Sequence, residues 1–591
     1  MEMTTADMTF SDLIVFYLEQ FGVEYVFSVP GSPLGPIYDA LARSEKRGGP
    51  RSVLARHEAG GAFMADGYAR ETGRIGVYCA TTGPGATNLI TGVASAYADH
   101  VPLLVITAQT PLPTFNLGAF QESSADVTDI VGMFEHCTRY NTIVTHPDQM
   151  EGKLAAAFTT ALQHPRGPAH VSVPVDILRA PRKGAGEVSF PHLCRLVTEP
   201  ASVTDYAAME RLCMEVHTAL SRNQKVVILV GHACAGATDE IIGFAELINA
   251  PILTTQRGKS RINPYHPLYR GVFGFAGHKT AREALADESV ALILAAGTDL
   301  GEWSTGGWDS LLLNDRLVHI HNTNAGFARS PMARLHVYGT ISTIFRKLTE
   351  RLKNLNQEGR LCLSGILGGP EQATPQYRAE SPEDTPYVPR GIEIRSPESS
   401  LYEDSHPFIK PQRVIREIVQ RFPPETRFLI DNSNSVPWSI HYFFNHRPGN
   451  YHLPIGFASM GWAIGASVGM ALGAQNTPIV CLTGDGCFLM SGQEITVAVQ
   501  ERLPVIFVLL NDHAYGMIKH AHRLSGTEHQ DFGIPAVDFC GMAKAVGADA
   551  YTIRSTEDLE RLDYHALCSR KGPTLLEVYV DPEEAPPLGM A

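Results

Sequence analysis

The sequence predicts an α/β protein built from three doubly wound parallel-sheet domains. Its 591 residues allow about three or four domains at roughly 100–200 residues each. Short apolar runs alternate with helical patterns along most of the chain, which is typical of parallel sheets covered by helices on both faces. The strand candidates are residues 75–80, 103–107, 171–175, 226–230, 291–295, 318–321, 428–431, 479–483, 505–510 and 575–580.

A repeated pattern indicates how these strands are divided among domains. Residues 167–176 and 572–581 share G-P-x4-V-x-V-D at identical spacing, so two related domains at the two ends of the chain are expected to close on the same kind of strand. A third domain separates them. The expected boundaries are 8–180 for the N-terminal domain, 200–350 for the central domain, 355–410 for a linker rich in Pro, Ser and Gly, and 411–582 for the C-terminal domain.

Charge and cysteine content exclude several partner classes. With 48 Lys and Arg against 62 Asp and Glu, the net charge of −14 argues against nucleic acid and against an anionic membrane surface. The ten cysteines form no C-x-x-C pair, which favours reduced thiols and a cytoplasmic location. The charge-free stretch 456–474 is mostly Gly, Ala and Ser, and we expect a small-residue helix packed inside the protein rather than a membrane span.

The most informative local pattern is a strand that ends in a Gly-Asp-Gly turn at residues 484–486. At the carboxyl end of a parallel strand, such a turn and the following helix present N–H groups to phosphate, and Asp485 is available to a hard cation. A tight structural turn would explain the triplet alone. The next strand candidate runs into Asp512, and 512 − 485 = 27 residues suffice for a helix and a strand, so both carboxylates can reach one metal ion. A diphosphate–Mg²⁺ site is therefore expected.

With these motifs the chain resembles the thiamine-diphosphate enzymes, whose metal motif is Gly-Asp-Gly followed, a helix and a strand later, by a pair of asparagines. The resemblance is close to the acetolactate synthase and pyruvate oxidase branch and covers nearly the whole chain outside the linker. Besides the metal motif, the segments that carry it are 29–41, 56–70, 81–109, 119–122, 258–274 and 456–467.

The resemblance implies thiamine diphosphate and Mg²⁺ as cofactors and assigns them residues. Glu58 matches the glutamate that hydrogen-bonds the aminopyrimidine ring from the partner subunit and drives ylide formation. Met460 matches the bulky residue beneath the cofactor, although core packing would also explain a methionine there, and the Ala458 carbonyl would accept from the 4′-amino group. The expected Mg²⁺ ligands are Asp485, Asp512 and the Ala514 carbonyl, and the other expected cofactor contacts are Ser433, Asn434, Ser435, Gly484, Gly486, Cys487, Tyr515, Gly516 and Met517.

The reaction that the resemblance implies follows from the cofactor. Its carbanion adds to a 2-oxo acid, carbon dioxide leaves, and the acyl unit is passed to an acceptor. Phe120 and Gln121 match residues that line the site over the thiazolium and steer that acceptor. Because the family's sites lie between two chains, a homodimer is the minimum unit and a homotetramer is expected.

Four departures from the acetolactate synthase pattern bear on specificity. Asp512 replaces the second asparagine, and Ser32 places a hydroxyl near the thiazolium where the family usually has none. Asp299 stands where the synthases have an arginine that contacts flavin and the second 2-oxo acid, so a guanidinium for an acceptor carboxylate is missing. Ala521 replaces the tryptophan that narrows the acceptor pocket. We therefore predict a carboligase that takes pyruvate or a similar 2-oxo acid as donor and a bulkier carbonyl compound as acceptor, giving an acyloin.

Three alternatives remain open at this point. The chain could be an authentic acetolactate synthase, a flavin-dependent 2-oxo acid oxidase, or a catalytically silent relative kept for binding or regulation, which only Asp512 favours. Bound FAD is also left open. The central domain has Gly231, Gly297 and Asn322 at strand ends suited to a dinucleotide, but any doubly wound domain has such residues there.

Overall fold

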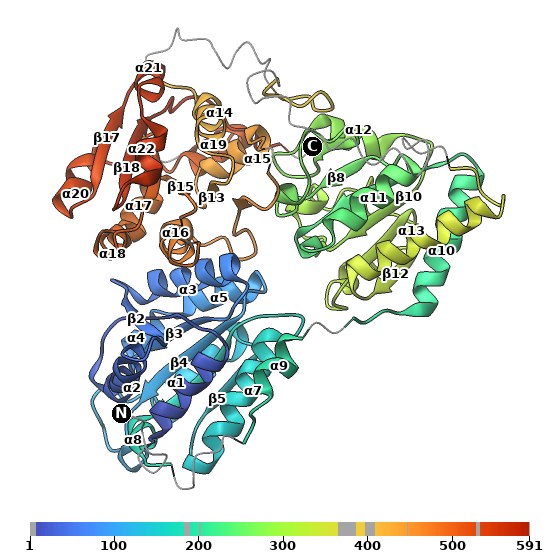
Figure 1. The fold of residues 1–591 in the computed structure, drawn as a ribbon. Helices are drawn as coiled ribbons and strands as arrows, with labels where there is room; N and C mark the ends of the chain where they lie inside the picture. Colours follow the sequence, from blue (N-terminus) through green and yellow to red (C-terminus); the bar gives the residue numbers. More distant parts are fainter. Residues whose placement is uncertain are drawn as a thin grey trace.

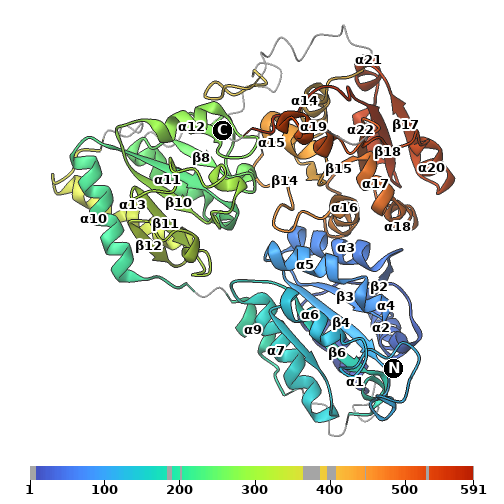
Figure 2. The ribbon, with the colours of Figure 1, turned by 180° about the vertical axis from the view of Figure 1, so that it is seen from behind.

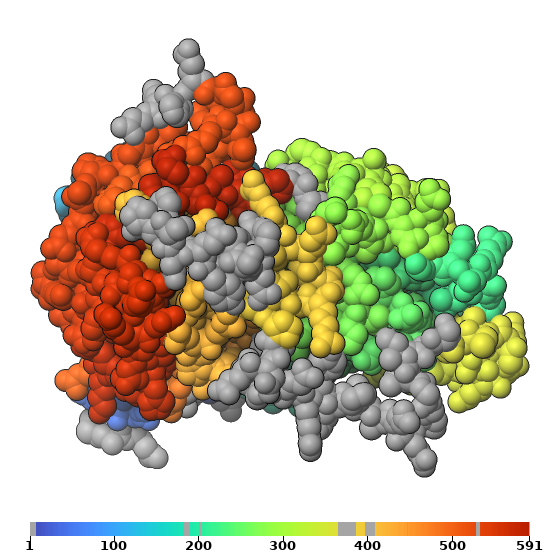
Figure 3. Space-filling view, turned by 90° about the horizontal axis from the view of Figure 1, so that it is seen from above, coloured from blue at the N-terminus to red at the C-terminus, as the bar shows by residue number. Residues whose placement is uncertain are grey.

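The structure, a computed structural model, describes residues 8–182, 189–199, 202–363, 386–395, 408–445, 447–474, 476–527 and 532–589. These residues form three six-stranded parallel sheets, so the predicted fold class is confirmed. Figure 1 shows three lobes, with the N-terminal helices α3 and α5 facing α16 of the C-terminal lobe. Figure 3 shows the central and C-terminal lobes side by side.

The N-terminal sheet has the strand order β2-β1-β3-β4-β6-β5. Its first helix begins at a capping box, in which the Thr9 side chain accepts from the Asp12 N–H and the Asp12 side chain accepts from the Thr9 N–H, a sequence-encoded start signal. The strands are β1 Tyr25–Ser28, β2 Arg51–Leu54, β3 Gly76–Ala80, β4 Leu103–Gln109, β5 Tyr140–Ile143 and β6 Ala169–Pro174. The helices are α1 Phe10–Gln20, α2 Gly35–Glu45, α3 Glu58–Thr72, α4 Pro84–Thr87, α5 Ile90–Ala98, α6 Ile130–Phe134, α7 Met150–Leu162, α8 Val175–Arg179 and α9 Leu193–Thr198.

The C-terminal sheet repeats this topology, in the order β14-β13-β15-β16-β18-β17. The two strands of the repeated sequence pattern, β6 and β18, hold the same place in their sheets, which explains the repeat. The strands are β13 Arg427–Ile430, β14 Tyr451–His452, β15 Ile479–Gly484, β16 Val505–Asn511, β17 Asp549–Ile553 and β18 Thr574–Tyr579. The helices are α14 Pro411–Arg421, α15 Ser435–Tyr442, α16 Trp462–Gly473, α17 Asp485–Ser491, α18 Ile495–Gln500, α19 Gly516–Ser525, α20 Phe539–Ala545, α21 Thr556–Glu560 and α22 Tyr564–Ser569.

The central sheet has a different order, β12-β11-β10-β7-β8-β9, which is that of dinucleotide-binding folds, with the switch point between β7 and β10. Its strands are β7 Lys225–Val230, β8 Ile252–Thr254, β9 Tyr269–Val272, β10 Val290–Ala296, β11 Leu317–His321 and β12 Leu335–Tyr338. Its helices are α10 Tyr206–Ser221, α11 Thr238–Ile248, α12 Lys279–Ala286 and α13 Ile341–Gln357.

Part of the predicted linker packs against the folded domains. Tyr387 and Ile392 are buried, and the Tyr387 hydroxyl donates to the Tyr442 carbonyl. Residues 364–385 and 396–407 of the predicted linker lie outside the described residues. The stretch 386–395 therefore belongs to the core rather than to a free tether.

The predicted small-residue helix is α16, and it packs tightly against α3, as Figure 2 shows from behind. A Cβ at Gly67 would lie 2.0 Å from the Ala466 carbonyl oxygen, and one at Gly469 would lie 1.8 Å from the Met64 carbonyl oxygen. The two backbones touch there, so larger residues cannot fit. In the described ranges, no helix is both long and apolar enough to cross a membrane. All ten cysteines are free.

Candidate active site

A cavity of about 110 Å³ opens at the carboxyl ends of β13, β15 and β16. Every residue that the resemblance assigned to the cofactor, apart from Glu58 and Ala458, lines it. The lining residues are Pro411, Asn432, Ser433, Asn434, Ser435, Trp438, Met460, Gly484, Asp485, Gly486, Cys487, Leu510, Asp512, Ala514, Tyr515, Gly516, Met517, Ile518 and Val580. The cofactor candidates among them come from four separate segments, 433–435, Met460, 484–487 and 512–517. Three of these segments follow parallel strands that end at the same sheet edge, where such convergence is expected.

Glycines keep this hollow open where the turns approach one another. A Cβ at Gly516 would lie 2.1 Å from Asp512 Oδ2, and one at Gly486 would lie 2.7 Å from the Tyr515 ring. A larger residue at either position would displace a side chain that lines the cavity. Helix α17 begins directly at Asp485, so its first N–H groups face the same end of the sheet, where an anionic group is favoured.

Two carboxylates meet in this cavity. Asp485 Oδ1 accepts from the Gly486 N–H at 2.7 Å, whereas its buried Oδ2 has no hydrogen-bond partner. Asp512 accepts from the Ala514 N–H and from Asn434 Nδ2, both at 3.3 Å. Burial, with the Asp512 charge, raises the pKa of Asp485 to about 7, and burial raises that of Asp512 to about 6.

An unpartnered carboxylate oxygen beside a second carboxylate fits a hard divalent cation. The part of the chain that the structure describes contains no group of three or more His, Cys, Asp or Glu side chains around one metal position. A cation here would therefore be bound by two carboxylates, by backbone carbonyl oxygen and by diphosphate oxygens. That all-oxygen donor set suits Mg²⁺ better than a softer metal.

Asp431, which sequence reasoning missed, holds the cavity's framework together. Its Oδ1 accepts from the Asn432 and Gly461 N–H groups at 3.0 and 2.9 Å, and its Oδ2 accepts from Thr483 Oγ1 at 2.9 Å. Burial raises its pKa to about 6. The carboxyl ties the ends of β13 and β15 to the turn before α16. The available signal was an acidic residue at the end of an apolar strand candidate.

The loop of residues 454–461 crosses between β14 and α16 in a constrained shape. Asn432 Nδ2 donates to the carbonyls of Pro454 and Ser459 at 3.1 and 3.2 Å. Ala458 has φ +60°, a conformation that costs a non-glycine residue free energy and persists only when its surroundings impose it. Met460 lines the cavity, whereas Ala458 does not.

The N-terminal candidates lie at the carboxyl edge of their own sheet, away from the cavity lining. Glu58 is the first residue of α3, is buried, and accepts from Asn88 Nδ2 at 3.1 Å. Gln121 has φ +58° and accepts from Thr82 Oγ1 at 3.4 Å. Phe120 is 87% exposed, and Ser32 is exposed at the start of the 3-10 helix η2 (Ser32–Leu34). None of these residues lines the cavity of its own chain.

Glu494 is a second residue that sequence reasoning missed. Its carboxylate accepts from the Arg56 and His57 N–H groups at 3.1 and 2.9 Å, and burial raises its pKa to about 7. A C-terminal-domain side chain therefore fixes the backbone that leads into Glu58. No local motif marks it, because the contact joins positions far apart in the sequence.

The two specificity candidates also lie outside the cavity lining. Ala521 is exposed on α19, one turn beyond Met517. Asp299 lies in the central domain, 3.7 Å from Nε2 of both His232 and His321 and 3.9 Å from an Arg257 nitrogen.

The strand-end turns of the central domain are a poor fit for a flavin dinucleotide. The Gly231 N–H donates to the Ala296 carbonyl at 2.8 Å and the Gly297 N–H to the Ile320 carbonyl at 2.9 Å. A pyrophosphate needs such groups as donors, and here they are engaged.

Three family models match the chain, one on each sheet. They are the N-terminal TPP binding domain (residues 8–130), the central domain (214–348) and the C-terminal TPP binding domain (431–578) of thiamine pyrophosphate enzymes. The chain belongs to the thiamine pyrophosphate enzyme family. It is an acetolactate synthase-like enzyme of that family that depends on thiamine pyrophosphate, the same compound as thiamine diphosphate.

Relatives in this family match over nearly their full length. An acetolactate synthase of Arthrospira platensis is 29% identical over 582 residues, which covers 96% of this chain and 93% of the relative. The large subunit of acetolactate synthase isozyme 2 of Escherichia coli is 28% identical, with 96% and 95% covered. A solved structure from Mycobacterium smegmatis, assigned as a thiamin diphosphate-dependent enzyme, has a TM-score of 0.74 at 21% identity and covers 98% of this chain and 100% of its own. This structural likeness supports the fold.

Proposed function

We propose that this enzyme is a carboligase that decarboxylates a 2-oxo acid such as pyruvate and joins the acyl unit to a bulkier carbonyl acceptor, giving an acyloin. The observation that carries the cofactor part is the buried, unpartnered Oδ2 of Asp485 beside Asp512 in the cavity. When bound there, thiamine diphosphate supplies a nucleophilic carbon that adds to the 2-oxo acid, allows carbon dioxide to leave and transfers the acyl unit.

In this proposal the C-terminal domain holds the cofactor's charged end. Asp485, Asp512 and the Ala514 carbonyl bind Mg²⁺. The N–H groups at the start of α17 and the residues Ser433–Ser435 before and at the start of α15 bind the diphosphate. Asp512 in place of an asparagine adds negative charge to the site. This charge would strengthen Mg²⁺ binding and weaken binding of the diphosphate.

The N-terminal domain of a second copy completes the site. Glu58 would hold a proton at a ring nitrogen of the aminopyrimidine, and Phe120 with Gln121 would face the acceptor. The separation of Glu58 from its own chain's cavity and the 87% exposure of Phe120 support this arrangement. We therefore propose a homodimer as the minimum unit and a homotetramer as the assembly.

The acceptor is proposed to be bulkier than a second pyruvate and to lack a carboxylate. Met517 lines the cavity and Ala521 follows on the same face of α19, where a methyl group leaves more room than an indole. Asp299 offers no cation to an acceptor carboxylate. Decarboxylation and carbon–carbon bond formation involve no net oxidation, so the proposed reaction needs no flavin.

The proposal is tested by incubating purified protein with thiamine diphosphate, Mg²⁺ and pyruvate, with and without a panel of aldehydes and ketones. A carboligase of this kind consumes pyruvate and forms mixed acyloins only with an added acceptor. Acetolactate from pyruvate alone would instead identify an authentic synthase. Oxygen consumption would identify an oxidase, and no pyruvate loss would identify a silent relative.

A further inference from the structure

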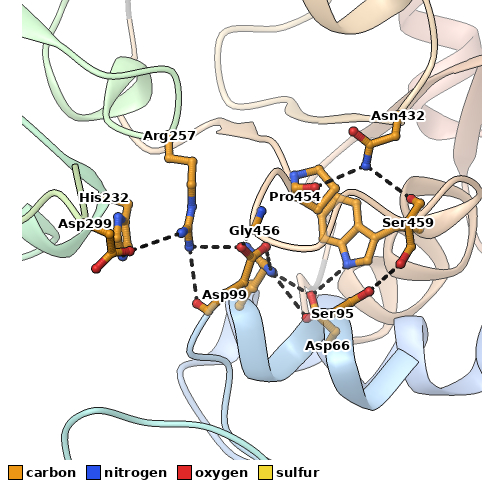
Figure 4. Close-up of polar contacts among 12 residues, drawn as sticks. Asp66, Ser95, Asp99, His232, Arg257, Asp299, Asn432, Pro454, Gly456 and Ser459 are labelled. Carbon is orange, nitrogen blue, oxygen red and sulfur yellow. Dashed lines mark hydrogen bonds and ion pairs between the residues drawn. The ribbon is translucent and has the colours of Figure 1, made fainter. Parts of the chain in front are cut away.

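The 454–461 loop is fastened to the N-terminal domain on both sides of Ala458 and Met460 (Figure 4). The Gly456 N–H donates to Asp99 Oδ1 at 3.1 Å, and the hydroxyls of Ser459 and Ser95 lie 2.6 Å apart. Just after the loop, Trp462 Nε1 donates to Asp66 Oδ1 at 3.1 Å.

Asp99 is the one of these anchors that also contacts the central domain. Its carboxylate accepts from Arg70 at 2.8 Å within its own domain and pairs with Arg257 of the central domain at 3.3 Å. Burial alone would raise the pKa of Asp99, but Arg257 and Arg70 hold it below its usual range. The carboxylate is thus charged at neutral pH, and its hydrogen bonds are of the stronger, charge-assisted kind.

The Asp99 carboxylate and the loop backbone are in close contact at Gly456. A Cβ at Gly456 would lie 2.4 Å from Asp99 Oδ1 and 2.8 Å from the Ala98 carbonyl. Arg257 is held in turn, because its guanidinium donates to the Asp99 carbonyl at 3.3 Å and lies 3.9 Å from Asp299. All three domains therefore meet at one carboxylate, as Figure 4 shows.

One ion pair between the N- and C-terminal domains does not reach this loop. Arg427 of β13 pairs with Glu71 of α3 at 3.1 Å, and both side chains are largely buried. Their partners are each other, Asn450 and the Glu425 carbonyl. This pair joins the N- and C-terminal domains as Asp99 does but contacts no residue of 454–461, so it is a matched control.

We infer that the Asp99–Arg257 pair positions the 454–461 loop so that the Ala458 carbonyl and the Met460 side chain meet thiamine diphosphate. The inference rests on the proposed cofactor roles of these two residues. It makes Asp99 and Arg257 positioning residues, and it gives the central domain a part in catalysis through a guanidinium rather than through a bound flavin.

The test compares wild type, Arg257→Met, Arg257→Lys and Glu71→Gln as full-length protein with excess Mg²⁺. Calorimetric titration gives the Kd for thiamine diphosphate. Proton NMR at saturating cofactor gives the rate at which the thiazolium C2 proton exchanges for deuterium. Since a hydrogen-bonded charge is lost, Arg257→Met should raise Kd about tenfold or more and slow the exchange. Arg257→Lys should restore part of the affinity and part of the exchange rate. Glu71→Gln should change the melting temperature but neither Kd nor the exchange rate.

A folded Arg257→Met protein with wild-type Kd and exchange rate would overturn the inference, even if its melting temperature fell. If Arg257→Met fails to fold, Arg257→Gln removes the same charge while keeping a polar side chain, and unchanged Kd and exchange in that variant would equally overturn the inference. A wild-type protein that binds thiamine diphosphate without exchanging the proton would refute the proposed function and, with it, this inference.

Discussion

Asp485 and Asp512 stand at the carboxyl ends of the paired strands β15 and β16, and the Asp512 charge helps raise the pKa of Asp485. Two buried carboxylates side by side destabilise the protein until a cation lies between them. The pair thus connects protein stability to metal binding.

Replacing Asp485 with Asn should separate these two effects. Without Mg²⁺, Asp485→Asn should melt at a higher temperature than wild type, because the repulsion is relieved. Its Mg²⁺ affinity in the presence of thiamine diphosphate should fall about tenfold or more, because a charged ligand is lost. Calorimetry and thermal denaturation measure both quantities. Equal Mg²⁺ affinity in the two proteins would show that Asp485 is not a ligand.

Glu58→Gln tests the proposed proton transfer. The amide keeps the shape of the side chain and its contact with Asn88 but cannot share a proton with a ring nitrogen, so pyruvate consumption should fall by about 10²-fold or more. Circular dichroism and melting temperature should stay close to wild type. Full activity in the variant would contradict the role given to Glu58.

Ala521→Trp should narrow the range of acceptors. An indole on the α19 face beyond Met517 fills the space proposed for a bulky acceptor, so kcat/KM should fall for large aldehydes and change little for small ones. Ala521→Ser, which hardly changes volume, serves as the control. If the tryptophan variant uses large and small acceptors in the wild-type ratio, the acceptor does not lie beside α19.

His170 predicts a pH effect on stability. It is buried between Thr107 and Asn141, and burial lowers its pKa from 6.5 to about 3. In the folded state burial keeps the imidazole neutral, whereas in the unfolded state His170 takes up a proton near pH 6.5. The contribution of His170 to the free energy of unfolding is therefore fully present above pH 6.5 and is lost as the pH falls toward about 3. The stability gap between wild type and His170→Asn should therefore narrow over that range in urea unfolding. A constant gap for His170→Asn over that range would contradict the expectation.

The central domain is expected to lack flavin when the protein is purified. The engaged N–H groups of Gly231 and Gly297 disfavour a pyrophosphate. Heat-released flavin fluorescence measures the content directly. FAD at one equivalent per chain would refute this reading of the strand ends and would favour the oxidase alternative.

The sequence predicted the fold well where burial leaves a strong pattern and less well elsewhere. Each strand candidate coincides with a strand, because strands inside a parallel sheet are apolar throughout. The strands that it missed are short, and most lie at sheet edges, where fewer apolar residues are needed: β1, β2, β5, β8, β9, β12, β14 and β17.

The residues of the candidate site likewise divide into those that a local sequence pattern marks and those that it does not. The Gly-Asp-Gly turn and Asp512 could be found because a cation and a phosphate require particular residues at strand ends. Asp431 carried only a general signal, an acidic residue at the end of a strand candidate, and Glu494 and Asp99 carried none. All three act by accepting backbone N–H groups or arginine donors from distant segments. Any buried acidic residue could make such contacts, so only the folded arrangement distinguishes them.

The contact between α3 and α16 has a consequence for the assembled enzyme. Glu58 begins α3 and Met460 lies two residues before α16, and the helices touch backbone to backbone at Gly67 and Gly469. In the proposed dimer, each chain contributes its Glu58 to one catalytic centre and its Met460 to the other. Because the helices cannot slide past each other without a clash, a displacement of Glu58 at one centre would, in such a dimer, be expected to move Met460 at the other.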